Sequence, residues 1–194
     1  RYNLEYSCGM LTDFAAHQLD IMQWALNKDG IEPVAIENIK GRLPPFTDLY
    51  NTLAEPFSFE IVYEDGLRVF VSSDYAYGCR FYGENGKQVY ATNGKLETNP
   101  PELMREKIGE NEVRLIRSGQ QEKNFIEAVY SGEKPISPVQ AGFSALTPAA
   151  LAHIGMRIGR ASLKWQAAKT RFENDPEADK FLAPHMRGLW RLDV

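Results

Sequence analysis

The sequence predicts an α+β domain, in which an open, mostly antiparallel sheet carries helices on one face. Apolar side chains recur at helical spacing over residues 12–27, alternate with polar ones in the strand-rich residues 33–94, and return to helical spacing at 120–131 and 144–160. A helix, then strands joined by tight turns, then further helices is the order expected when one face of an antiparallel sheet is covered. We expect residues 1–194 to form a single domain.

Composition excludes several classes of function. The chain has 194 residues, 43% hydrophobic and 25% charged, which is typical of a soluble globular protein. The net charge of -4 argues against a nucleic-acid-binding surface, and no apolar stretch approaches the roughly 18 residues of a membrane-spanning helix. Cys8 and Cys79 are too few for a disulfide framework and lack metal-ligand spacing. We expect both cysteines to be small buried hydrophobic residues.

The helix at 12–27 is predicted to be buried. Apolar residues nearly encircle it, among them Phe14, Met22 and Leu26, and Gly30 provides a stop. An unpaired polar group in a buried helix is costly. The polar residues of this helix are therefore candidates for a specific role.

The strand-rich region contains two predicted hairpins. Asp65 and Gly66 both tolerate the positive φ of a tight turn, so the segments on either side of them are expected to pair. The predicted strands are Phe57–Tyr63 with Leu67–Tyr75, and Cys79–Tyr82 with Gln88–Thr92; residues 41–55 are expected to be a loop, and Asn93-Gly94 another turn.

The last third is predicted to be helical, followed by a surface strap. A short helix is expected at Pro101–Ile108, Gly132 ends the helix at 120–131, and residues 161–194 form the strap. No glycine-rich phosphate loop links a strand to a helix, and Gly83–Gly86 lies inside a hairpin. The sequence therefore predicts no nucleotide-binding domain within this chain.

Asp13 and His17 are the leading candidates for chemistry. They lie four residues apart, which places both side chains on one face of the helix, and Asp20 and Trp24 continue that face. A carboxylate can hold one imidazole nitrogen and leave the other free to exchange a proton. Asp20 is a candidate substrate-binding residue.

Two other interpretations of these residues remain open. Asp13 lies near a helix start, where a carboxylate interacts favourably with the helix dipole, and His17 can be a satisfied core histidine. Alternatively Asp13, His17 and Asp20 could supply mixed ligands to a divalent metal, although we expect no metal site. His153 and His185 are expected to be structural or surface residues, and no nucleophile motif is present.

Four segments, in the same order, resemble the C-terminal half of Gfo/Idh/MocA oxidoreductases. Residues 7–20, SCGMLTDFAAHQLD, are similar to the family segment that follows its Rossmann domain. Residues 124–135 resemble its Asn-Phe helix and Lys-Pro turn, and residues 154–165 its last long helix. The DPEA at 175–178 and the RGLW at 187–190 are similar to its C-terminal tail.

The resemblance implies an NAD(P)-dependent dehydrogenase that acts on a hydroxyl group of a sugar, polyol or glycoside. In relatives the matching histidine, here His17, is the acid/base, with the aspartate, here Asp13, beside it. The family's catalytic lysine belongs to the Rossmann half, so Lys134 does not correspond to it. NAD or NADP would be held by that N-terminal half, and we expect this chain alone to bind neither and to be inactive.

The resemblance also implies a homo-oligomer assembled through the sheet. The sequence departs from the family at Ser7-Cys8, Ala15, Gln18 and Gln121, which leaves the substrate open. A redox-assisted, NAD-dependent glycosidase and a non-catalytic binding or assembly module are the alternative functions. The chain starts at Arg1 without a targeting motif, so its localisation stays undetermined.

Overall fold

A computed structural model of the chain describes residues 9–41, 43, 56–113, 118–183, 186 and 188–190. Cys8, His185, Arg187 and most of the predicted loop at 41–55 lie outside the described residues. The elements, in chain order, are α1 (Gly9–Ala25), β1 (Ala35–Lys40), β2 (Ser58–Val62), β3 (Arg68–Ser72), β4 (Cys79–Tyr82), η1 (Glu84–Gly86), β5 (Gln88–Thr92), β6 (Lys95–Asn99), η2 (Pro101–Arg105), α2 (Gln121–Ser131), α3 (Val139–Ile158), β7 (Leu163–Gln166), η3 (Ala167–Lys169), β8 (Arg171–Phe172) and α4 (Pro176–Asp179).

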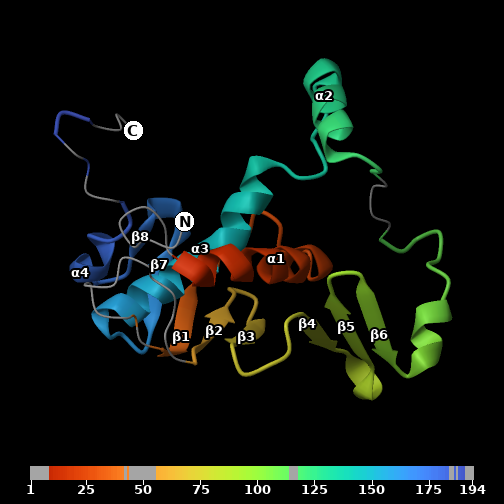
Figure 1. Cartoon of the computed structure of the whole chain (residues 1–194), viewed down its shortest axis with the longest axis horizontal. Coiled ribbons are helices and arrows are strands. Elements are labelled where there is room, and N and C mark those ends of the chain that lie inside the picture. The colour runs from red at the N-terminus through yellow and green to blue at the C-terminus, as the bar shows by residue number, and fades with distance from the viewer. Residues whose placement is uncertain are drawn as a thin grey trace.

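The predicted α+β class is confirmed. The strands form a five-stranded sheet in the order β3-β2-β1-β7-β8 and a three-stranded sheet in the order β4-β5-β6, and every described pair is antiparallel. Helices α1 and α3 pack on each other and lie together on one side of the larger sheet (Figure 1). The sequence predicted one sheet, and the structure divides it into two.

The core lies between the larger sheet and these two helices. Along β2, Phe59 and Ile61 are fully buried while the residues that alternate with them are half-exposed, as the sequence alternation predicts. Ile36 of β1 lies opposite Ile61 and belongs to the same buried cluster. Helix α1 contributes Leu11, Leu19 and Met22 to that cluster; α3 contributes Ala149, Leu151, Ala152, Ile154 and Met156.

Helix α3 contains a proline in its interior, and a buried glutamine of α1 compensates for it. Pro148 has no N–H, so the carbonyl of Ser144 four residues earlier lacks its helical donor. The Nε2 of Gln23 donates to this Ser144 carbonyl at 2.8 Å. The proline is therefore tolerated because a second helix supplies the missing hydrogen bond.

The chain enters the smaller sheet at Gly78, where the backbone lies very close to strand β5. This residue has a φ of +152°, and a Cβ there would lie 2.7 Å from the Tyr90 ring and 2.8 Å from the Ala91 carbonyl oxygen. Only glycine lets the chain turn so closely against β5. Strand β6 follows the predicted Asn93-Gly94 turn and extends the strand-rich region beyond its predicted end at 94. The sequence did not predict this strand because Leu96 is its single apolar residue, so no apolar alternation marks it.

The C-terminal third differs from expectation in two places. Helix α3 begins at Val139, five residues before the predicted start, directly after the extended residue Pro138. Residues 161–194 were expected to be a surface strap. Instead β7 pairs with β1, and Trp165 and Phe172 are buried in the core with their rings 5.2 Å apart.

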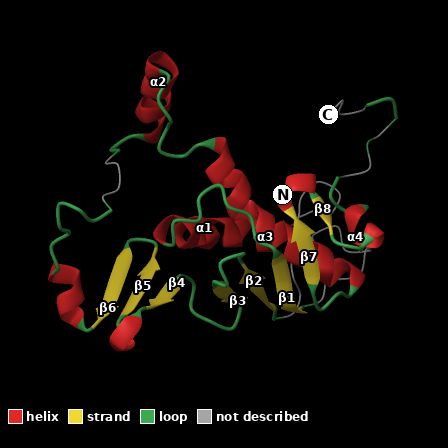
Figure 2. Ribbon diagram, turned by 180° about the vertical axis from the view of Figure 1, so that it is seen from behind, coloured by secondary structure: helices red, strands yellow, loops and turns green. Residues whose placement is uncertain are grey.

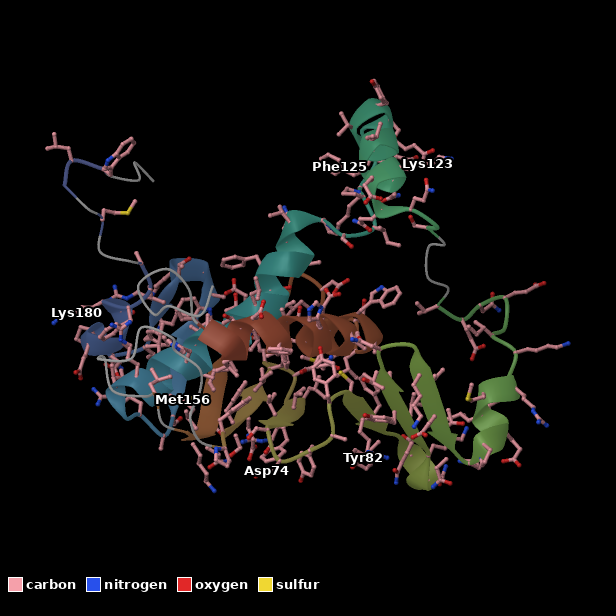
Figure 3. The ribbon with its side chains drawn as sticks, viewed as in Figure 1. Asp74, Tyr82, Lys123, Phe125, Met156 and Lys180 are labelled. Carbon is pink, nitrogen blue, oxygen red and sulfur yellow. The ribbon has the colours of Figure 1, made fainter. Side chains whose placement is uncertain are left out.

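Helix α2 projects away from the rest of the molecule. Both views place it apart from the two sheets and from α1 (Figures 1 and 2). It has no buried residue, and the side chains of Lys123 and Phe125 extend from it into the surroundings (Figure 3). Gly132 ends it in the left-handed conformation, as the sequence predicted. The predicted short helix at 101–108 is a 3-10 helix over Pro101–Arg105.

Candidate active site

The outer face of α1 carries the candidate catalytic residues. Successive residues of an α-helix are rotated by about 100°, so Asp13, His17, Asp20 and Trp24 fall within about 60° of one another, opposite the buried Met22. His17 and Asp20 are exposed and Asp13 is half-buried. The structure therefore brings the predicted residues onto one face, and it places His17 on the surface rather than in the core.

Among the candidate residues of α1, Asp20 has a shifted pKa. Although Asp20 is exposed as a residue, partial burial of its carboxyl group raises the pKa of Asp20 above its ordinary value; the negative charge of Asp29 raises it further, and the nearby His17 lowers it. The effect of His17 is the smallest of the three, and it is opposite in direction to the other two. Spacing favoured Asp13 as the partner of His17, and the structure adds Asp20 as a second acidic neighbour.

Aromatic side chains lie along α1 near both the first and the last of these residues. Phe14 meets Tyr77 edge to face with ring centroids 6.4 Å apart. The Tyr90 hydroxyl donates to the Tyr77 carbonyl oxygen at 2.8 Å, which fixes the segment between the two sheets beside α1. Trp24, at the other end, is half-exposed. The candidate face therefore combines an imidazole and two carboxylates with the aromatic side chain of Trp24.

A buried polar network fixes α1 relative to the sheet and α3. Gln23 donates to the Tyr63 hydroxyl at 3.2 Å and accepts from the Ser144 hydroxyl at 2.8 Å. Just past the helix, Lys28 forms a 2.5 Å ion pair with Asp65 in the β2–β3 turn. The orientation of His17 therefore depends on residues that the sequence did not identify. The sequence feature that could have identified this network is Gln23, a polar residue at a core position of a buried helix.

Cys79 anchors the smaller sheet under α1 and has no chemical role there. Its thiol donates to the Gln18 carbonyl oxygen at 3.0 Å, and burial raises its pKa to about 11. A thiol with such a pKa is protonated at neutral pH and a poor nucleophile. The Nε2 of Gln18 is buried, and no described residue pairs with it.

His153 is buried in the middle of α3, which agrees with the expectation that it is a structural residue. Burial and the positive charge of Arg157 lower its pKa to about 4, so it is neutral at physiological pH. No described group pairs with its Nε2. His153 therefore affects stability rather than catalysis.

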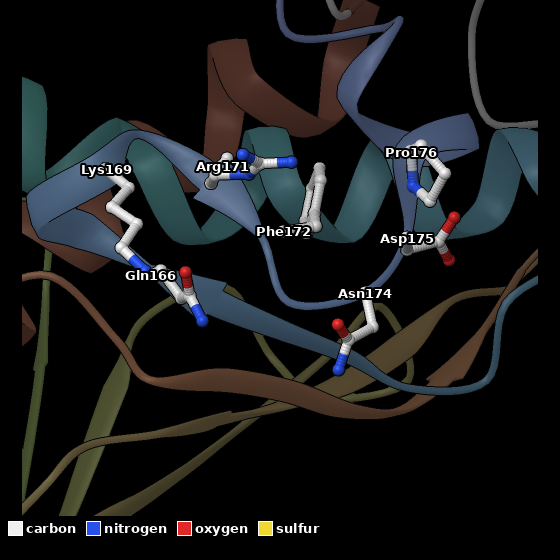
Figure 4. A pocket seen from close by; sticks show the side chains of 7 residues that line it. All are labelled: Gln166, Lys169, Arg171, Phe172, Asn174, Asp175 and Pro176. Carbon is white, nitrogen blue, oxygen red and sulfur yellow. The ribbon is translucent and has the colours of Figure 1, made fainter.

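Two surface grooves lie away from the candidate site. One, of about 420 Å³, is lined by Gln166, Lys169, Arg171, Phe172, Asn174, Asp175 and Pro176 (Figure 4). The other, of about 460 Å³, lies on the smaller sheet and contains Arg80 and Tyr90. Neither includes Asp13, His17 or Asp20. The candidate residues therefore lie on an open helix face outside both grooves. It is the chemistry of their side chains that identifies them as a candidate site.

The described residues do not form a site for a dinucleotide or a metal. Within them no strand leads through a glycine-rich turn into a helix of more than one turn, which is the cradle that a pyrophosphate requires. Gly83–Gly86 closes the β4–β5 hairpin. No described group of three or more His, Cys, Asp or Glu side chains is arranged to hold a metal ion.

Among the described helices, none combines the length and the apolarity to cross a bilayer.

The comparisons with known proteins gave one match. The model of the family described as "Oxidoreductase family, C-terminal alpha/beta domain", within Gfo/Idh/MocA, matches residues 1–192. The match covers nearly the whole chain, including α1 and its candidate residues. No curated protein and no solved structure matched the chain.

Proposed function

The chain belongs to the Gfo/Idh/MocA oxidoreductase family as its C-terminal α/β domain, and on that premise we propose that it is the substrate side of an NAD(P)-dependent dehydrogenase. The substrate is a compound with a CH–OH group, namely a sugar, polyol or glycoside. The observation that carries this proposal is an exposed imidazole, His17, with Asp13 and Asp20 on the same face of α1.

His17 acts as the acid/base. When the alcohol is oxidised, its carbon loses a hydride and its oxygen loses a proton, and the Nε2 or Nδ1 of His17 accepts that proton. Asp13 orients the imidazole ring, and Asp20 accepts a hydrogen bond from a substrate hydroxyl. The fixed position of α1 on Gln23 and Lys28 supports a rigid site.

The hydride acceptor is a nicotinamide, which supplies the redox chemistry when bound. The residues described above do not fit a dinucleotide, so we assign its binding to a nucleotide-binding domain on the N-terminal side of this chain. That domain docks against the outer face of α1, where His17 is exposed. Without it, residues 1–194 bind substrate weakly and are inactive.

The test is reduction of NAD and NADP by the full-length protein with a panel of sugars and polyols. Replacing His17 with Ala should lower turnover by roughly 10² to 10⁴, the range for a lost general acid or base. Because His17 is exposed, the melting temperature should stay unchanged. Lys180→Ala, at an exposed residue directly after α4, is the control and should retain full turnover. Unchanged turnover in the His17 variant would remove the catalytic assignment.

A further inference from the structure

Trp24 is a large aromatic side chain placed among polar groups. It is 47% exposed, and it lies on the same face of α1 as His17 and Asp20. No described residue accepts a hydrogen bond from its indole N–H. One face of the ring and a hydrogen-bond donor are therefore available beside the candidate catalytic residues.

The other two tryptophans differ from Trp24 in position and contacts. Trp165 is 6% exposed, and its indole N–H donates to the Glu32 carboxylate at 2.9 Å. Trp190 is 75% exposed but lies in the C-terminal segment, outside α1. Trp24 alone combines an accessible ring with a place on the face that carries His17.

The spacing along α1 sets the size of a ligand that could reach Trp24. A helix advances 1.5 Å per residue, so Asp20 lies about 4 to 5 Å beyond His17 and Trp24 about 10 Å beyond it. A single sugar ring with a hydroxyl at His17 reaches Asp20. It is too short to cover Trp24 as well, whereas two linked rings span the whole distance.

We propose that Trp24 is a substrate-binding residue that stacks against a second ring, so that the substrate is a glycoside or oligosaccharide rather than a free monosaccharide. The inference rests on the function proposed for His17. The ring that is oxidised lies over His17 and Asp20. The apolar C–H face of the next sugar, or an aglycone, packs on the indole ring, and a hydroxyl accepts from its N–H.

The expected effect on specificity follows from the strength of such contacts. An aromatic contact of this kind contributes on the order of tenfold in affinity. A monosaccharide gains nothing from it, because its ring does not extend beyond Asp20. Trp24 should therefore separate disaccharides from monosaccharides and leave the chemical step at His17 unchanged.

The kinetic experiment compares glucose with cellobiose, galactose with lactose, and mannose with mannobiose, using the full-length protein and NAD or NADP. The wild type should prefer the disaccharide of the accepted pair by about tenfold in kcat/KM. Trp24→Ala should abolish that preference by raising KM, with kcat retained, and Trp24→Phe should keep most of it. The control is Trp190→Ala, which removes an exposed tryptophan elsewhere and should retain the preference.

A binding experiment gives a readout that does not depend on turnover. The same disaccharides are titrated into full-length Trp190→Phe and into the Trp190→Phe, Trp24→Phe double variant, and tryptophan fluorescence is recorded. The difference between the two titrations isolates Trp24. We expect a saturable signal with a disaccharide and none with its monosaccharide.

The outcomes separate this inference from the proposed function. Equal kcat/KM for both members of each accepted pair, or equal losses on both in Trp24→Ala, would overturn the role of Trp24 while leaving dehydrogenase activity in place. If Trp24→Ala lowers kcat/KM equally for both sugars of a pair and also raises the KM for NAD, Trp24 packs on the nucleotide-binding domain instead of on the substrate. A Trp24-dependent signal without any cofactor reduction would support the subsite and contradict the dehydrogenase. Absence of that signal with all three disaccharides overturns the inference.

Discussion

Asp20 carries a charge that the fold disfavours. Its pKa is raised, first by burial and then by Asp29, so the native state binds the proton more tightly than the unfolded chain does. Stability is therefore lost as the pH rises from the ordinary Asp value through the raised one, and the loss persists at neutral pH. A carboxylate whose ionisation lowers the stability of the fold is more typical of a functional site than of a surface residue that stabilises the protein.

Replacing Asp20 with Asn should therefore raise the melting temperature of the isolated domain at pH 7. At pH 3 wild-type Asp20 is largely protonated, so the two proteins should melt at the same temperature. Thermal unfolding followed by circular dichroism at both pH values measures the effect. Glu122→Gln, on exposed α2, is the control for a general charge effect. A lower melting temperature for Asp20→Asn at pH 7 would mean that this carboxylate makes a stabilising contact.

His153 should make the fold sensitive to acid. Its native pKa of about 4 lies below its ordinary value of 6.5, so the unfolded chain takes up a proton first as the pH falls. Its contribution is fully present above pH 6.5 and is lost between about 6.5 and 4. The loss approaches about 3 kcal/mol, because each unit of pKa difference corresponds to about 1.4 kcal/mol.

The variant His153→Leu should flatten the pH dependence of the free energy of unfolding between 6.5 and 4. Leucine also removes a buried nitrogen that no described group satisfies, so stability at pH 7 should be unchanged or higher. Urea unfolding at a series of pH values gives both quantities. The interpretation fails if the variant keeps the wild-type slope over this range.

Among the elements, α2 stands out because its apolar side chains have no cover within the described structure. Phe125, Ile126, Val129 and Tyr130 are all exposed. An isolated helix of 11 residues is marginal in water, since most helical stability comes from packing. The Asn124 side chain, which accepts from the Ile136 N–H at 2.8 Å, ties α2 only to the turn that follows it.

Hydrogen exchange should therefore show α2 as the least protected of the long helices. In the isolated chain its amides should exchange within about tenfold of the unfolded rate, while those of α1 and the middle of α3 are strongly protected. Protection of α2 equal to that of α3 in the isolated chain would contradict this account.

At the scale of the whole molecule, the open face of the larger sheet is the surface to test for assembly. Arg68 forms ion pairs there with Glu37 at 2.5 Å and Glu60 at 2.8 Å. Phe70, which is 54% exposed, packs edge to face on Tyr75. Phe81, on β4 of the smaller sheet, shares the face of Cys79 and so turns toward α1.

We predict that the chain self-associates through this face, because an exposed aromatic pair beside a fixed charge network suits an interface. Light scattering over a range of concentrations should give masses above the 22.0 kDa of one chain, and Phe70→Glu should return the mass to that value. Phe125→Glu, at a similarly exposed position on α2, is the matched control and should still associate. A wild-type mass near 22.0 kDa at every concentration would mean a monomer with a wetted sheet face.

Local patterns in the sequence determined the elements and the composition of the candidate site. The alternation at 57–63, the Asp65-Gly66 turn and the glycine at 132 act over a few residues, so they predicted β2, its hairpin and the end of α2. The i, i+4 spacing likewise predicted that Asp13 and His17 share a face, because helical geometry alone sets it.

The tertiary structure decided everything that depends on contacts between distant residues. The sequence could not show that Gln23 satisfies the Ser144 carbonyl freed by Pro148, since these residues come from two helices more than 100 positions apart. It could not place β7 beside β1, divide the sheet at Gly78, or leave the stripe from Asp13 to Trp24 facing outward. Which side of a helix is covered depends on what packs against it. Periodicity therefore predicts the faces of α1, and only the assembled fold decides that the face with His17 is the open one.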